Sequence, residues 1–77
     1  MTVTVATTKM IDSHMVELEG AGPRGGKMNW TVRFKRNGDV LSGYQWEPPR
    51  GFLEAHEIPP EVKEAARKTH TAAGGSL

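Results

Sequence analysis

Residues 27–46, which read KMNWTVRFKRNGDVLSGYQW, decide the predicted fold because they have the pattern of a β-hairpin. Two runs in which β-branched and aromatic residues alternate with polar ones flank Asn37-Gly38, a pair typical of hairpin turns. In an antiparallel pair the numbers of opposing residues have a constant sum, and a change of one in that sum reverses which faces meet. The length of the loop therefore determines which side chains share the core.

Two loop lengths fit this turn, and they predict different faces. A two-residue loop gives a sum of 75 and places Trp30 opposite Gln45, which mixes apolar and polar side chains on each face. A three-residue loop, residues 36–38, gives a sum of 74 with Gly38 in the left-handed position of a type I turn plus G1 bulge. We prefer the three-residue loop, because it separates an apolar face from a polar one. The predicted core face is Met28, Trp30, Val32, Phe34, Val40, Ser42, Tyr44 and Trp46, and the predicted outward face is Asn29, Thr31, Arg33, Lys35, Asp39, Leu41, Gly43 and Gln45.

Two further strands are predicted before the hairpin. Residues 2–8 read TVTVATT, with Val3 and Val5 at a period of two, and residues 14–19 read HMVELE, with Val16 and Leu18 on one face. Residues 20–26, GAGPRGG, contain four glycines and a proline. This composition predicts a mobile loop between the second strand and the hairpin.

The part after the hairpin is predicted to be helical. Pro48 and Pro49 end the strand, residues 50–58 are predicted to form one or two helical turns, and residues 60–69 a helix with a narrow apolar stripe. The predicted fold is α+β: a small antiparallel meander of three to four strands with one C-terminal α-helix packed on its aromatic face. Residues 1–70 form a single ββββα domain and residues 71–77 a flexible tail in this prediction.

Length and composition restrict the class of protein. The chain has 77 residues and no cysteine, so one domain without disulfides or thiolate metal sites is expected. So small a core leaves homodimer formation open as a further way to bury apolar surface. No apolar run approaches the roughly 20 residues of a membrane span. The N-terminus does not resemble a signal peptide, so we expect no membrane partner and a cytoplasmic location.

The residue patterns favour a non-enzymatic protein. Asp12, Ser13 and His14 have the residue types of a hydrolase triad, but adjacent residues cannot easily converge as nucleophile, base and orienter. His56 lacks a second histidine four residues later, and spacing does not support a metal site drawn from all three histidines, His70 included. The glycine segment leads into a strand rather than a helix, which excludes a phosphate loop. We expect no catalytic residue, no cofactor and no metal.

The charge of the chain is nearly balanced, but its distribution is not. The total of 10 basic and 9 acidic residues gives a net charge of +1, whereas residues 27–46 carry four basic residues against Asp39 alone. The candidate partner-binding residues are therefore Lys27, Arg33, Lys35, Arg36 and Arg24. The preferred register places the aromatic side chains on the opposite face, away from this charge, which counts against binding of single-stranded nucleic acid.

These observations predict a small protein-binding module, a regulator or inhibitor of a larger protein machine. Chains of this kind are common among viral and mobile-element proteins, although no residue indicates that origin. The alternative is a nucleic-acid-binding module that uses the basic outer face of the hairpin.

Overall fold

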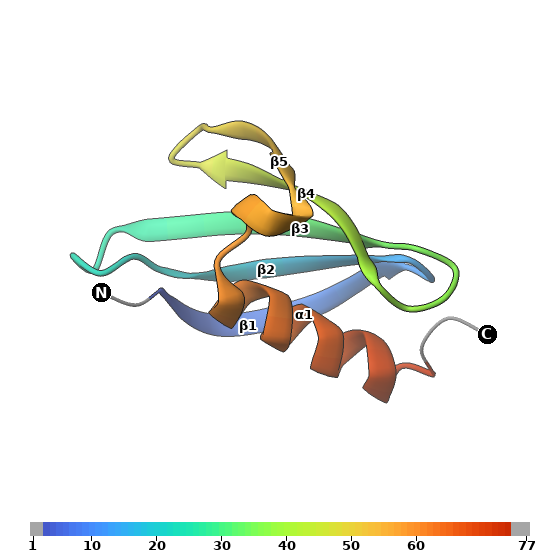
Figure 1. Ribbon diagram of the computed structural model, residues 1–77. Helices are drawn as coiled ribbons and strands as arrows, with labels where there is room; N and C mark the ends of the chain where they lie inside the picture. The colour runs from blue at the N-terminus through green and yellow to red at the C-terminus, as the bar shows by residue number, and fades with distance from the viewer. Residues whose placement is uncertain (1–2, 75–77) are drawn as a thin grey trace.

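Five antiparallel strands and one C-terminal helix make up residues 3–74, the part of the chain that the computed structural model describes (Figure 1). The α+β class is confirmed, but the sheet has five strands rather than three or four. The elements are β1 (Thr4–Asp12), β2 (Met15–Ala21), β3 (Lys27–Phe34), β4 (Val40–Glu47), β5 (Gly51–Glu54), a 3-10 turn η1 (Ala55–Glu57) and α1 (Pro60–Ala72).

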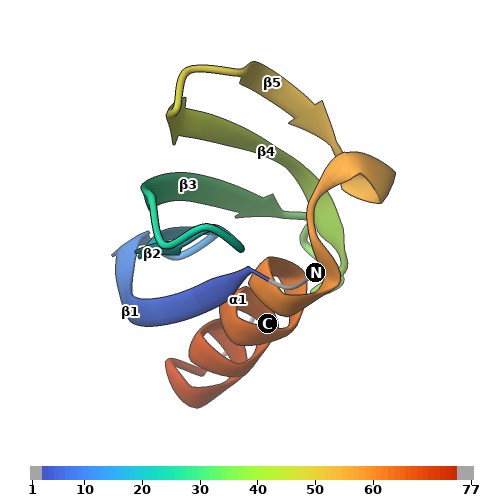
Figure 2. The same cartoon turned by 90° about the vertical axis from the view of Figure 1, so that its left-hand side faces the viewer.

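The sheet is a meander in which each strand pairs with its neighbours in sequence, in the order β1-β2-β3-β4-β5. Helix α1 packs on one face of β1, β2 and β3, while η1 packs against β4 and β5 (Figure 2). No helical segment of residues 3–74 packs on the opposite face of the sheet. We call this uncovered side the open face.

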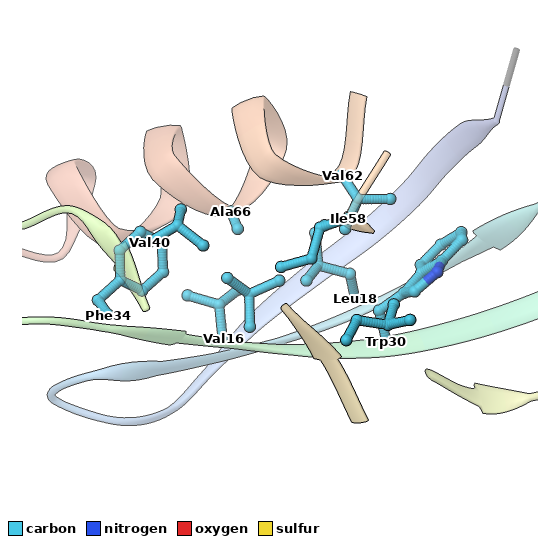
Figure 3. Packing of buried hydrophobic residues seen from close by; sticks show 10 residues of the cluster. Val16, Leu18, Trp30, Phe34, Val40, Ile58, Val62 and Ala66 are labelled. Carbon is cyan, nitrogen blue, oxygen red and sulfur yellow. The ribbon is translucent and has the colours of Figure 1, made fainter. Parts of the chain in front are cut away.

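The hydrophobic core lies between the sheet and the helical segments (Figure 3). Trp30 on β3 lies opposite Leu18 on β2, and Val32 lies opposite Val16, so the two central strands present one continuous apolar face. Val62 and Ala66 of α1 pack onto that face. The prediction that a C-terminal helix packs on one face of the sheet is therefore confirmed. The buried cluster consists of Val16, Leu18, Trp30, Val32, Phe34, Val40, Leu53, Ile58, Val62 and Ala66.

The turn of the β3–β4 hairpin has the predicted three-residue loop. The Lys35 amide donates to the carbonyl oxygen of Asp39 at 2.7 Å, and Gly38 has a φ of 95° in the left-handed region. Phe34 accordingly lies opposite Val40, with a sum of 74. The loop length and the role of Gly38 are therefore confirmed.

The predicted faces of β4 are nevertheless wrong, because a bulge follows the turn. The register shifts next to Leu41, so that Arg33 lies opposite Ser42 and Trp30 opposite Gln45, with a sum of 75. The extra residue reverses the alternation along the rest of β4. Tyr44 and Trp46 consequently lie on the open face, whereas Gly43 and Gln45 lie on the core side.

Residues 50–58 contain one helical turn, the 3-10 turn at Ala55–Glu57, but the predicted helical structure is replaced by strand β5 at Gly51–Glu54. Gly51, with a φ of 82°, lies at the start of β5, and Phe52 then pairs with Tyr44 and Leu53 with Gly43. In this strand Leu53 is buried in the core and Phe52 is exposed. The segment is too short for its periodicity to reveal a strand, so its pairing with β4 decided its structure.

The observed boundaries of other elements also differ from the predicted ones. The first strand was predicted at residues 2–8, of which residue 2 lies outside the described part, and it spans Thr4–Asp12. Bulges near Ala6 and Ile11 interrupt its alternation, which hid its length in the sequence. The predicted loop at residues 20–26 shortens to a turn at 22–26. Two backbone hydrogen bonds between Gly22 and Gly25 or Gly26 hold this turn. Gly20 belongs to β2, where a side-chain Cβ would collide with the carbonyl oxygen of Thr4 on β1.

The helix was predicted to end at residue 69 and continues to Ala72. Its last turn is held by His70, a buried residue whose ring stacks on Phe34 with centroids 4.2 Å apart. The ring nitrogen Nε2 lies 3.2 Å from the carbonyl oxygen of Ser13. Because a carbonyl oxygen only accepts hydrogen bonds, this contact requires the ring tautomer that has its hydrogen on Nε2. The tail predicted at residues 71–77 thus begins inside α1, and residues 75–77 lie outside the described part.

Candidate functional site

The open face carries three exposed aromatic side chains on two neighbouring strands. Tyr44 and Trp46 come from β4 and Phe52 from β5, with exposed fractions of 40%, 56% and 64%. Phe52 lies directly opposite Tyr44, and the rings of Tyr44 and Trp46 have centroids 4.2 Å apart at an angle of 42°. We call these three residues the aromatic cluster. Large exposed aromatic groups gathered on one face are typical of a binding surface.

Trp46 is fixed in place although it is exposed. A second register shift lies beside it, between the pairs Asn29–Glu47 and Trp30–Gln45. Its indole Nε1–H donates to the hydroxyl oxygen of Thr31 at 2.6 Å. Because this bond uses the only polar group of the indole, the exposed part of Trp46 is the ring itself.

The aromatic cluster lines a largely apolar hollow of about 220 Å³. Met15 from β2 and Arg33 from β3 complete its wall with the three aromatic rings. The remaining lining residues are Thr31, Ser42 and Gly43. Aromatic residues, methionine and arginine are the types enriched at the buried centres of protein interfaces. We call this space the aromatic hollow.

A second hollow adjoins the first and has a different chemistry. Glu17 and Glu19 of β2, Asn29 of β3 and Trp46 of β4 line a space of about 180 Å³. Trp46 borders both hollows. We call the second one the acidic hollow.

The open face as a whole is negatively charged. The strand registers place three basic side chains on this face, Lys9, Lys27 and Arg33, against five acidic ones. The acidic residues are Asp12, Glu17, Glu19, Glu47 and Glu54. The face has a formal charge of −2, although the whole chain has +1. The predicted basic outer face of the hairpin is thus corrected, because its neighbours β2 and β5 contribute carboxylates.

The five basic residues predicted to bind a partner do not form one patch. Arg24 and Lys27 lie at the turn between β2 and β3, where both border a hollow of about 240 Å³. Lys35 and Arg36 lie in the turn at the other end of β3, where Lys35 is eight residues, or roughly 26 Å, away from Lys27. Only Arg33 borders the aromatic hollow. The structure therefore separates these residues into two groups, Arg24 and Lys27 at the start of β3 and Arg33, Lys35 and Arg36 at its end.

The three histidines do not come together at one site. His14 and His70 are neighbours with ring centroids 6.4 Å apart, and His70 serves the packing described above. His56 lies in η1, where Glu54, His56 and Glu57 form an exposed group of possible metal ligands within 4.8 Å. The Glu57 carboxylate already accepts a hydrogen bond from the Glu54 amide at 2.9 Å. This group closes the 3-10 turn through a capping box.

The chain matches no protein-family model, no curated protein and no solved structure. Within residues 3–74, none of the helical segments has the length and apolar character needed to cross a membrane. A function for the protein must therefore be argued from the chemistry of the open face.

Sequence reasoning did not find the aromatic hollow. Its residues come from four strands, and the preferred register placed Tyr44 and Trp46 in the core. One signal was present: that register put Leu41 on the polar face and Ser42 on the apolar face. A bulge at Leu41 removes this conflict. Leu41 then has no partner on β3, and Ser42 pairs with Arg33 on the polar face.

Proposed function

We propose that the protein is a non-enzymatic protein-binding module whose contact surface is the aromatic cluster on the open face. The carrying observation is that Tyr44, Trp46 and Phe52 surround a hollow although buried apolar residues already fill the core on the other side. In typical protein interfaces, aromatic side chains that become buried on binding contribute much of the binding energy, because their truncation to alanine weakens binding strongly. A regulator or inhibitor of a larger protein would need only such a surface.

Affinity capture with matched variants tests this proposal. The full chain is immobilised and exposed to a nuclease-treated lysate of its native host, then washed at moderate salt. The wild type should retain a protein partner, and the Tyr44→Ala/Phe52→Ala double variant should lose it because the wall of the hollow is removed. An Ile11→Ala/Leu41→Ala variant should retain the partner, since it removes two exposed apolar side chains outside the hollow.

Two results of the capture experiment would contradict the proposal. Equal retention by the wild type and the Tyr44→Ala/Phe52→Ala variant would show that the partner binds elsewhere. Retention of protein from an untreated lysate but none from the nuclease-treated lysate would indicate that nucleic acid forms the contact. Circular dichroism of both variants checks that they remain folded.

Binding of single-stranded nucleic acid is the second candidate, and one observation favours it. The corrected register brings Arg33 beside Tyr44 and Trp46, whereas the predicted register had placed charge and aromatic rings on opposite faces. Bases stack on such rings in single-strand-binding proteins. The formal charge of −2 on the same face opposes it, because phosphate contacts provide most of the affinity in such complexes. We therefore rank this function below protein binding.

A further inference from the structure

We propose that the open face binds a basic segment of a partner protein, with an arginine or lysine side chain held in the acidic hollow against Trp46. This inference rests on the proposed protein-binding function and names the chemistry of the partner. It follows from three properties of the acidic hollow: its hydrogen-bonding groups, the exposed ring of Trp46 and its position beside the aromatic hollow.

The acidic hollow offers chiefly carboxylate acceptors, and two of its N–H donors are already used. The Asn29 side-chain Nδ2 donates to the Glu47 carboxylate at 3.3 Å, and the Trp46 indole N–H donates to Thr31. Glu17 and Glu19 contribute two carboxylates, which only accept hydrogen bonds when ionised. The two carboxylates therefore favour a ligand group that donates hydrogen bonds.

Neither carboxylate of the hollow forms an ion pair shorter than 4.0 Å within the described residues. The ion pairs shorter than 4.0 Å there are His56–Glu54 and Lys68–Glu64, and neither includes Glu17 or Glu19. Lys9 lies opposite Glu17 in the register. Glu19 lies between Thr7 and Asn29, so no cation faces it across either neighbouring strand. A cationic donor is therefore favoured over a neutral one.

Trp46 makes the hollow selective for the side chain of a basic residue. A cation placed over the face of a tryptophan is attracted by the ring quadrupole, and the attraction grows as water is excluded. The guanidinium of arginine is planar and can stack on the ring while it donates to carboxylates. Since the indole is held by Thr31, its orientation does not have to be fixed on binding.

The aromatic hollow determines what accompanies the cation. It shares Trp46 with the acidic hollow and is lined by Met15, Tyr44 and Phe52, so it suits an apolar side chain. A segment that places an apolar residue near an arginine would fill both spaces. Charge complementarity supports such a basic segment over a second copy of this chain or a nucleic acid, because two faces of charge −2 repel and phosphates are repelled likewise.

Nuclear magnetic resonance titration of the isotope-labelled full chain tests the inference. The probes are three short peptides in which leucine alternates with arginine, serine or glutamate, together with an oligothymidylate. The arginine peptide should shift the indole N–H signal of Trp46, and its affinity should fall as salt rises. The serine peptide should bind more weakly, and the glutamate peptide and the oligonucleotide should not bind. The indole signal of buried Trp30 reports whether the fold is unchanged.

Matched variants assign the effect to the acidic hollow. The Glu17→Gln/Glu19→Gln variant should weaken binding of the arginine peptide about tenfold, since two exposed charge contacts are lost. The Glu61→Gln/Glu64→Gln variant removes the same charge from α1 and should change the affinity less than about twofold. The comparison separates a local contact from a general effect of net charge.

Several outcomes would overturn the inference. They are equal binding of the serine and arginine peptides, no shift of the Trp46 signal, binding of the oligonucleotide, or a concentration-dependent Trp46 signal without peptide. The first of these would leave the proposed protein-binding function intact, because an apolar contact would then suffice. The capture experiment with Tyr44→Ala/Phe52→Ala tests the protein-binding function separately from the peptide titration, since those two residues do not line the acidic hollow.

Discussion

Replacement of Trp30 by alanine is expected to lower the free energy of unfolding by about 3–5 kcal/mol. Trp30 is 1% exposed and lies between Leu18 on β2 and Gln45 on β4, so its removal leaves a cavity in the centre of the sheet. A chain of 77 residues is expected to have a total stability of roughly 4–12 kcal/mol. The loss is therefore a large fraction of the total, and much of the variant should be unfolded at 37 °C.

Urea denaturation followed by far-ultraviolet circular dichroism measures this loss. Trp30→Phe is the matched control. Its aromatic ring fills most of the space, and it removes an indole N–H that is buried without a hydrogen-bond partner among residues 3–74. Loss of an unpaired buried donor offsets part of the smaller volume, so this variant should be much more stable than Trp30→Ala. Equal destabilisation by phenylalanine and alanine would contradict the packing described for Trp30.

Replacement of Trp46 by alanine is expected to have the opposite profile: a small change in stability and a large loss of binding. Trp46 is 56% exposed, so its main contribution to the fold is the hydrogen bond to Thr31, worth about 1 kcal/mol. Trp46 borders both the aromatic and the acidic hollow. Truncation of such a central aromatic residue should weaken partner binding about 30-fold or more, equivalent to about 2 kcal/mol.

Calorimetric titration with the arginine-leucine peptide measures the binding loss, and urea denaturation measures the stability. Trp46→Phe keeps an aromatic ring without the bond to Thr31 and should retain intermediate affinity. If Trp46→Ala instead unfolds the protein as Trp30→Ala does, Trp46 belongs to the core. That result would restore the register with a sum of 74 and remove the proposed binding surface.

The contrast between these two tryptophans shows how far the hairpin could be predicted. The pattern around Asn37-Gly38 specified the turn, including the left-handed conformation of Gly38. It did not reveal the bulge at Leu41, which leaves the turn intact but reverses the faces of the following residues. A bulge depends on what packs against the strand, and that information lies outside the hairpin.

The packing that decides the faces of β4 comes from the segment after it. Ile58 lies so close to Gly43 that a Cβ added there would be 2.8 Å from the Ile58 Cδ1 atom. Leu53 and Ile58 fill the core beside β4, and Gln45 next to them donates from Nε2 to the carbonyl oxygen of Pro48 at 3.0 Å. The rings of Tyr44 and Trp46 would not fit at the core positions that Gly43 and the hydrogen-bonded Gln45 occupy. Tyr44 and Trp46 are consequently displaced to the open face.

The charge of the site was unpredictable for a related reason. Counted along the chain, the hairpin is basic, and this arithmetic is correct for residues 27–46. A sheet face instead combines alternate residues from all its strands. Glu17 and Glu19 come from β2 and Glu54 from β5, so the face around Arg33 becomes acidic.

The sequence by itself determined the local features of this protein: the α+β class, the hairpin turn, the apolar alternation of Val16, Leu18, Trp30 and Val32, and the helix that begins at Pro60. These depend on neighbouring residues and on periods of two or 3.6, which are visible in one dimension. Only the tertiary structure decided that residues 51–54 pair as a fifth strand and that the aromatic cluster faces outward. Both depend on contacts between segments distant in sequence, and a single bulged residue, Leu41, was enough to reverse the predicted faces.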